Sequence, residues 1–334
     1  MNLYLSMLTQ ITAPTVPQSG AHLMPEQTDN FGAGLFRIVQ EAIGSIRPDL
    51  KEAAAISMSL IGLLMLISLI RLIPGSNTKL PDFIGAVGIG TILLQSTNSL
   101  IALGVTTIQD LSSYGKLLLP VMTSALAAQG GITTSTALYA GTALFNSILS
   151  SILSNLMVPM LYIYLVLATA HGALGEEILK KMAEFIKWLS VWILKGVLYL
   201  FTGYMGITGV LSGTTDAAAL KAAKLTISGV VPVVGGILSD ASEAVLVGAG
   251  LVRNAAGVYG ILALLAVFAG PFLRIGCHYL MIRITGAVCS VFGSKQCTQL
   301  ISDYSGAMGL LLAMTGTMCL LGLISTVCFL KGVG

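Results

Sequence analysis

Long apolar runs separated by short polar or proline-containing stretches form the dominant pattern along this chain. The first clear run, residues 53–73, carries no charge before Arg71 and is followed by Pro74 and Gly75. Its 21 residues match the roughly 20 that an α-helix needs to cross a bilayer. Similar runs lie at residues 83–108, 117–128, 133–158, 159–173, 188–211, 243–269, 271–292 and 305–330. The pattern predicts an all-α polytopic integral membrane protein with about eight transmembrane helices.

Two apolar stretches are too short and too broken to be plain membrane spans. Within residues 226–247, Pro232, Gly235 and Gly236 interrupt an apolar piece of about a dozen residues. The piece at 117–128 contains Pro120 and is followed by two glycines. Broken backbone at membrane depth must be buried in protein or line a cavity. We therefore expect two Pro/Gly-broken re-entrant hairpins, with structural breaks at Pro120, Pro159, Pro232, Gly235, Gly236 and Pro271.

The prolines also indicate an internal duplication. Pro120 and Pro159 recur as Pro232 and Pro271 at one offset, since 232 − 120 = 112 and 271 − 159 = 112. The alternative is chance, because proline and glycine are common in membrane helices. We interpret the pattern as two repeats, at about residues 88–198 and 199–330. Many transporters build their translocation path from repeats of broken helices.

Asp240 and Glu243 open the long apolar helix that is expected after the second hairpin. Their spacing is that of a capping box, in which Asp240 caps the helix and Glu243 reaches back to the cap's amide. In the first repeat Thr133 and Thr136 stand at these positions, so a cap alone does not require carboxylates. The alternative to a cap is a pore mouth or a contact with a partner's basic residue.

Composition supports the membrane class and excludes several others. The chain has 334 residues, of which 55% are hydrophobic and 9% charged, whereas about 25% are charged in a typical soluble domain. The net charge of +3 and the scattered basic residues do not suggest nucleic acid as a partner. Residues 1–52 are expected to form a short polar extramembrane segment with an amphipathic stretch at 31–46, ahead of a transmembrane domain at 53–334.

Small polar residues repeat inside one of the apolar runs. Asn146, Ser147, Ser150, Ser151 and Ser154 follow one another at helical spacing and predict a polar stripe on one helix face. Such a stripe lines a water-filled path in some membrane proteins. In others it lets helices pack closely, and the sequence does not decide between the two.

Basic residues also occur inside the apolar runs of the second repeat. Arg253, with Asn254, lies near the expected centre of a span and should face water or a carboxylate. Arg274, His278 and Arg283 lie nearer the helix ends and are expected to reach the membrane interface or lipid phosphates. Pore-lining or assembly candidates are therefore Asp240, Glu243, Arg253, Asn254, Asn146, Ser150 and Ser154.

Motifs for catalysis are missing from the sequence. It has neither a His-Glu-x-x-His pattern nor a Gly-x-Ser-x-Gly pattern, and its three histidines are dispersed, so we expect no enzyme activity, metal or cofactor. The five cysteines lie mostly in apolar runs and are expected to be buried single thiols. Cys289 and Cys297 flank a polar turn and form a disulfide only if that turn faces an oxidising space.

Several stretches resemble one known family. The most specific are TTDA at 214–217, LKAAKL at 220–225, VPVVGG at 231–236 and SDASE at 239–243, in unbroken order. They are similar to the stage III sporulation protein AE family, and the likeness extends from about residue 53 to the C-terminus. Members of that family carry a signal peptide and a longer exported segment, and this N-terminus departs from that pattern.

The resemblance implies a function in endospore-forming bacteria. It implies a non-enzymatic core component of a secretion-like channel that links mother cell and forespore, in the mother-cell membrane surrounding the forespore. Expected partners are further copies of the chain, other stage III sporulation membrane proteins and membrane lipid. The alternatives are a secondary transporter with a substrate path inside each protomer, and a membrane scaffold without a path.

Overall fold

The computed structural model describes the backbone of residues 14–24, 31–71, 79–230 and 235–331, and the side chains of these residues except Lys79 and 208–253. The described part contains helices and no strand. The helices are α2 (Gln18–Ala21), α3 (Phe31–Ser45), α4 (Arg47–Arg71), α5 (Lys79–Ala128), α6 (Ile132–Ile152), the π-helix η1 (Leu153–Met157), α7 (Val158–Leu174), α8 (Glu177–Val230), α9 (Gly235–Cys289) and α10 (Lys295–Lys331).

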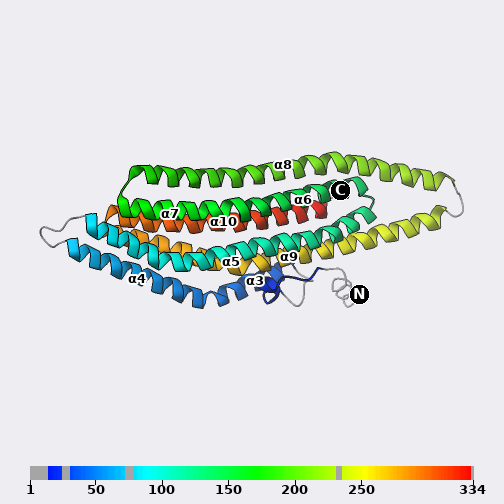
Figure 1. The fold of residues 1–334 in the computed structure, drawn as a ribbon. Coiled ribbons are helices and arrows are strands. Elements are labelled where there is room, and N and C mark those ends of the chain that lie inside the picture. Colours follow the sequence, from blue (N-terminus) through cyan, green and yellow to red (C-terminus); the bar gives the residue numbers. More distant parts are fainter. Residues whose placement is uncertain (1–13, 25–30, 72–78, 231–234, 332–334) are drawn as a thin grey trace.

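The long helices run side by side along one axis, with α8 on one side of the bundle and α4 on the other (Figure 1). The ends of α8 and α9 that residues 231–234 join extend beyond the neighbouring helices (Figure 1). With 55 residues, α9 is about 82 Å long at 1.5 Å per residue. A bilayer's hydrocarbon core is only about 30 Å thick, so the longest helices exceed what a single crossing requires.

Six helical stretches in the described part are long and apolar enough to cross a membrane. They are Arg47–Arg71, Leu80–Ala128, Ile132–Leu174, Glu177–Ile207, Asn254–Cys289 and Lys295–Lys331. This supports the all-α membrane class and gives a smaller number than the eight spans expected from the sequence. The difference arises because several apolar runs that prolines seemed to separate belong to one continuous helix.

Pro120 and Pro271 do not break the chain. Each lies inside a long helix, Pro120 in α5 and Pro271 in α9, so residues 117–128 are the end of α5 and not a separate re-entrant piece. At Pro159 the helix also continues, but the turn before it widens into η1. A proline cannot donate to the carbonyl four residues earlier, and a π-turn accommodates such a lost hydrogen bond.

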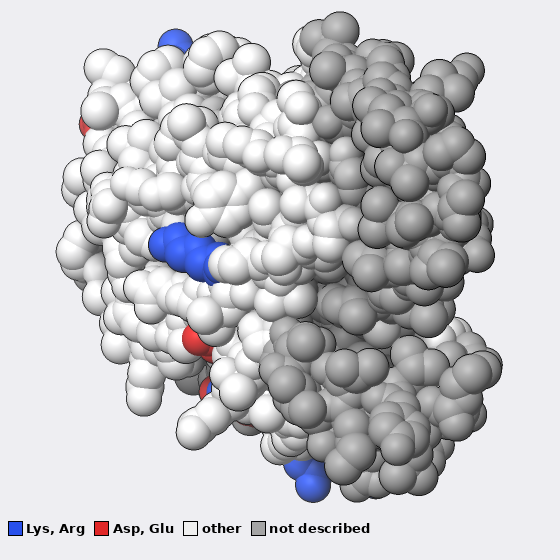
Figure 2. Space-filling view, turned by 90° about the vertical axis from the view of Figure 1, so that its right-hand side faces the viewer, with Lys and Arg blue, Asp and Glu red and all other residues white. Residues whose placement is uncertain are grey.

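The turn at residues 129–131 joins α5 to α6, and Gly130 there has a φ of 89°, which favours glycine. Seen from the end of the bundle where this turn lies, the described surface carries few charged side chains (Figure 2). The sequence accounts for part of this, because no residue from 117 to 175 is charged. Both α6 and α7 are therefore entirely uncharged helices.

The interior of the bundle is centred on α10, which contacts α5, α6, α7, α8 and α9. Tyr114, Tyr164, Tyr304 and Phe201 are among the largest fully buried side chains. Close contact depends on glycines: a Cβ at Gly104 of α5 would lie 2.6 Å from a methyl carbon of Leu311 in α10. Small residues that let helix backbones approach are typical of packing within membranes.

The N-terminal segment packs against the bundle. Ile38 and Ala42 of α3 are buried in a small apolar cluster with Leu262 and Ala266 of α9. The predicted amphipathic stretch at 31–46 is therefore a helix, and its apolar face covers part of α9. Its other face is exposed and includes Phe36.

The predicted duplication pairs Pro120 with Pro232. Pro120 lies inside α5, with eight residues of that helix after it, whereas Pro232 lies outside the described backbone. A superposition of residues 117–174 on 229–290 remains a prediction.

Candidate functional site

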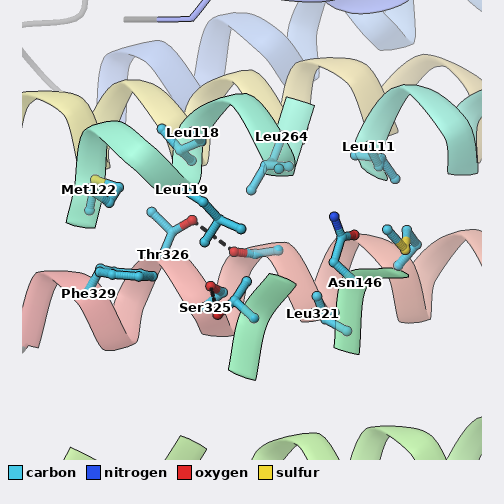
Figure 3. Close-up of a pocket in the computed structure, with 14 residues that line it drawn as sticks. Leu111, Leu118, Leu119, Met122, Asn146, Leu264, Leu321, Ser325, Thr326 and Phe329 are labelled. Atoms are coloured by element: carbon cyan, nitrogen blue, oxygen red, sulfur yellow. Dashed lines mark hydrogen bonds between the residues drawn. The ribbon is translucent and has the colours of Figure 1, made fainter. Parts of the chain in front are cut away.

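A small cavity lies among α5, α6, α9 and α10, and Asn146, one of the residues expected to be functional, lines it (Figure 3). Its volume is about 20 Å³, which is room for about one water molecule. Most of its lining is apolar, from side chains such as Leu119, Leu264 and Phe329. A cavity of this size and lining is a packing gap between helices and too small to be a conduit.

Asn146 lies at this cavity and joins two helices. Its side chain is buried, and its Nδ2 donates a hydrogen bond of 3.0 Å to the backbone carbonyl oxygen of Ser112 in α5. One turn away, Thr142 Oγ1 and Ser325 Oγ of α10 are 2.7 Å apart and share a hydrogen bond (Figure 3). Polar groups on the inner face of α6 are thus paired with neighbouring helices.

The rest of the expected polar stripe does not face the same space. Ser150 and Ser154 are half-buried, whereas Ser147 and Ser151 are exposed on the outer surface of α6. Asn155 is also exposed there, and its Nδ2 donates to Ser151 Oγ at 3.2 Å. The stripe therefore divides into an inner part that ties helices together and an outer part that faces the surroundings of the protomer.

Arg274 forms an ion pair between two helices that are far apart in sequence. Its Nε lies 3.0 Å from Asp49 Oδ1 of α4, and its Nη2 lies 3.7 Å from Glu52 Oε2. Beside it on α9, His278 is buried, with Nδ1 3.5 Å from Ser96 Oγ of α5. Arg274 and His278 were expected to reach the membrane interface or lipid phosphates, and the structure gives both of them protein partners on α4 and α5.

A second ion pair holds the other end of α4. Arg71, at the end of this helix, pairs with Asp82 in the first turn of α5. Asp49 and Arg71 are 71 − 49 = 22 residues apart, or about 33 Å along a helix. This length is close to the thickness of the hydrocarbon core, so charged pairs hold the bundle at both ends of an apolar stretch that fits one bilayer.

Asp303 lies at the junction of α7, α8 and α10. Its Oδ1 accepts a hydrogen bond of 3.1 Å from Gln299 Nε2 and one of 3.4 Å from the hydroxyl of Tyr164 in α7. Lys187 of α8 places its Nζ 5.9 Å from the centre of the Tyr164 ring. An acid, a tyrosine and a lysine from three helices thus meet at the edge of the bundle, where Tyr164 is buried, Asp303 is half-buried and Lys187 is exposed.

A polar cavity of about 370 Å³ lies at the end of the bundle where α7 meets α8 and α9 meets α10. Its lining includes the Arg71–Asp82 pair, His171, Glu177 and Lys180. Charges of both signs line it, so it has no clear preference for a cation or an anion. No group of three or more metal-ligating side chains was found among the described residues.

Several predicted site residues lie outside the described side chains, namely Asp240, Glu243 and Arg253, and Pro232 lies outside the described backbone. Asn254 is exposed. Gly235 and Gly236 lie at the start of α9, so Asp240 is the sixth residue of this helix and not the N-cap that the predicted capping box requires. The proposed pore-lining and assembly functions of this stretch stay predictions.

Comparison with known families identifies the relatives of this bundle. The model of the stage III sporulation protein AE family matches residues 36–332. The chain belongs to this family. It is 23% identical over 203 residues to the stage III sporulation protein AE of Bacillus subtilis (strain 168), which covers 60% of this chain and 51% of that protein. The chain thus spans about half the length of this curated relative. No solved structure matches. Family membership supports a role in sporulation.

Sequence reasoning did not select the charged groups that connect the helices of this stage III sporulation protein AE family member. Asp49 and Glu52 were assigned to an extramembrane segment, and Asp303 lies just ahead of the last expected span at 305–330. A signal was available for Asp303, because an acid next to the long apolar part of a helix is expected to have a partner. The identity of that partner depends on which helices are neighbours, and this information comes only from the fold.

Proposed function

We propose that this chain is a non-enzymatic core component of a secretion-like channel between mother cell and forespore, and that the path runs between protomers or partner subunits. The proposed path between protomers rests on the pairing of polar groups inside the bundle. Asn146, Thr142 and Arg274 each bond to a neighbouring helix. Polar groups that line water keep free hydrogen-bonding capacity, whereas these hold helices together.

The outer surface of α8 favours an assembly of several copies. In the described part of this helix, only 17% of the 18-residue apolar stretch is buried inside the protein. This is the smallest share among the six candidate spans. Trp192 and Tyr199 are 62% and 71% exposed on it. Aromatic side chains are enriched at protein interfaces, and α8 lies on the opposite side of the bundle from α4 (Figure 1). We propose that α8 faces a neighbouring copy.

Disulfide cross-linking in membranes tests this arrangement. Tyr199→Cys on α8 is compared with Met58→Cys on α4, which is 77% exposed and so equally accessible. Each substitution is made in a chain whose five native cysteines are replaced by serine or alanine. We expect cross-linked dimers from Tyr199→Cys and monomers from Met58→Cys.

The mass of the purified protein in lipid provides the second measurement. A closed oligomer supports the channel, especially if it makes vesicles permeable. A monomer that carries a solute across vesicles would instead support the secondary-transporter alternative, and an oligomer that leaves vesicles tight would support the scaffold. Cross-links from Met58→Cys alone would contradict the assignment of α8.

A further inference from the structure

A positively charged groove lies between the last turns of α9 and the first turns of α10. It encloses about 520 Å³. Arg283 lines it from α9, while Lys295, Thr298 and Ser302 line it from α10. Its lining contains no aspartate or glutamate. Two cations beside several hydroxyl groups form a surface that suits a phosphate group.

One hydroxyl in this groove has no partner within the protein. Thr298 Oγ1 is inaccessible to solvent and makes no hydrogen bond. It lies beside Gly293, where a Cβ would be 3.1 Å from it. Buried hydroxyl groups are nearly always hydrogen-bonded in proteins. The orphaned hydroxyl gains a partner if the side chain turns toward an oxygen of a group bound in the groove.

Two carboxylates, Asp303 and Glu177, lie close to residues of the groove but do not line it. Gln299 lines the groove, but its amide nitrogen donates to Asp303, which faces Tyr164. Lys295 also lines the neighbouring cavity that contains Glu177. Neither acid contributes to the lining of the groove, so its own charge stays positive.

Apolar side chains continue from the groove along the outside of α9. Leu280, Ile284 and Val288 are 56%, 58% and 44% exposed and follow at intervals of four residues, so they share one helix face. Arg283 is anchored next to this face, with its guanidinium carbon 6.0 Å from the centre of the Tyr279 ring. A phosphate site at the end of an apolar helix face matches the shape of a phospholipid, whose headgroup and acyl chains occupy adjacent positions.

We propose that this groove binds the headgroup phosphate of an anionic phospholipid from the surrounding bilayer. Arg283 and Lys295 neutralise the phosphate, Thr298 donates a hydrogen bond to it, and the acyl chains lie along Leu280, Ile284 and Val288. The groove is formed within one protomer. The proposal is therefore independent of the channel function and of any oligomeric state.

Native mass spectrometry of the full chain in detergent tests the proposal. The probes are phosphatidylglycerol, phosphatidylcholine and inorganic phosphate. The variant Arg283→Gln with Lys295→Gln is compared with Lys116→Gln with Lys181→Gln, a control that removes the same net charge from exposed lysines outside the groove. We expect the groove variant to bind phosphatidylglycerol about tenfold or more weakly, and the control to bind within about twofold of the parent chain.

Thr298→Val provides a second variant of nearly equal volume. We expect weaker phosphatidylglycerol binding but unchanged thermal stability without lipid, because the hydroxyl has no protein partner to lose. If the groove variant and the lysine control lose phosphatidylglycerol binding equally, the binding is general charge attraction and the proposed site is wrong. Inorganic phosphate that binds as tightly as phosphatidylglycerol, or phosphatidylcholine that binds equally well, would overturn the assignment to an anionic lipid.

Discussion

Asn146 of α6 donates a hydrogen bond of 3.0 Å to the backbone carbonyl oxygen of Ser112 in α5. The bond joins two neighbouring helices, and it lies beside a cavity large enough for only about one water molecule. A residue that seemed suited to a water-filled path thus fastens one helix to the next. This hydrogen bond supports a structural function for Asn146 and not a conducting one.

Replacing Asn146 by leucine is expected to lower the free energy of unfolding by about 1 kcal/mol, because one interhelical hydrogen bond is lost. Thermal unfolding in detergent measures the change. Asn155→Leu is the control, since Asn155 is exposed and bonds only within its own helix. An Asn146 variant of unchanged stability that blocks conduction would show that this side chain lines a path after all.

The pairing of Arg274 with Asp49 is expected to couple the two residues energetically. Arg274→Gln and Asp49→Asn should each destabilise the bundle, and the double variant should lose less than the sum of the two. Both groups are partly exposed, so the coupling energy is expected to be at most about 1 kcal/mol. A double-mutant cycle of unfolding in detergent measures it, and strict additivity would contradict the pair.

The apolar pattern predicted the membrane class and the position of the first span correctly. The run at 53–73 became α4, which ends at Arg71, because its length and lack of charge leave little choice of structure. The interpretation of the prolines was wrong at Pro120 and Pro271. A proline removes one hydrogen bond, and neighbouring helices in a bundle compensate for it, so its effect depends on packing that the sequence does not show.

Partners of the charged groups were the least predictable feature. Arg274 and Asp49 are 274 − 49 = 225 residues apart, and nothing in their local sequence connects them. The same holds for Tyr164 and Asp303, which meet only because α7 and α10 are adjacent. For such residues the sequence indicates that a partner is needed, and the arrangement of the helices determines which one it is.

Gly141 is expected to be essential for the contact between α6 and α8. A Cβ at this position would clash with the ring of Tyr204, whose hydroxyl also donates to the Ala137 carbonyl oxygen. Gly141→Ala should therefore lower the free energy of unfolding by about 1–3 kcal/mol. Gly196→Ala in α8 is the control, because a Cβ there meets no atom within 4 Å. The Gly196 variant should be neutral or slightly stabilised. If both variants changed the free energy of unfolding equally, the close contact between Gly141 and Tyr204 would be contradicted.

Asp240 and Glu243 lie in the block most similar to the stage III sporulation protein AE family. Their side chains are outside the described residues, so the prediction rests on the sequence. The corresponding positions of the proposed first repeat are Thr133 and Thr136, which carry no charge. These threonines lie inside α6, whose N-cap is Gly131, and Asp240 is the sixth residue of α9, so neither pair stands at an N-cap as the sequence had indicated. If the carboxylates act in assembly or conduction, Asp240→Asn with Glu243→Gln should disrupt it while leaving the amount of folded protein unchanged.

The experiment separates charge from side-chain shape by comparing two double variants. Asp240→Asn with Glu243→Gln removes the charges and keeps the shape, whereas Asp240→Thr with Glu243→Thr reproduces the pair found in the first repeat. Sporulation efficiency, oligomer mass and the amount of membrane-inserted chain are measured for each. If the charge is what matters, both variants should lose sporulation to a similar extent at normal protein levels. Normal sporulation in both would show that the two carboxylates are not needed for assembly or conduction.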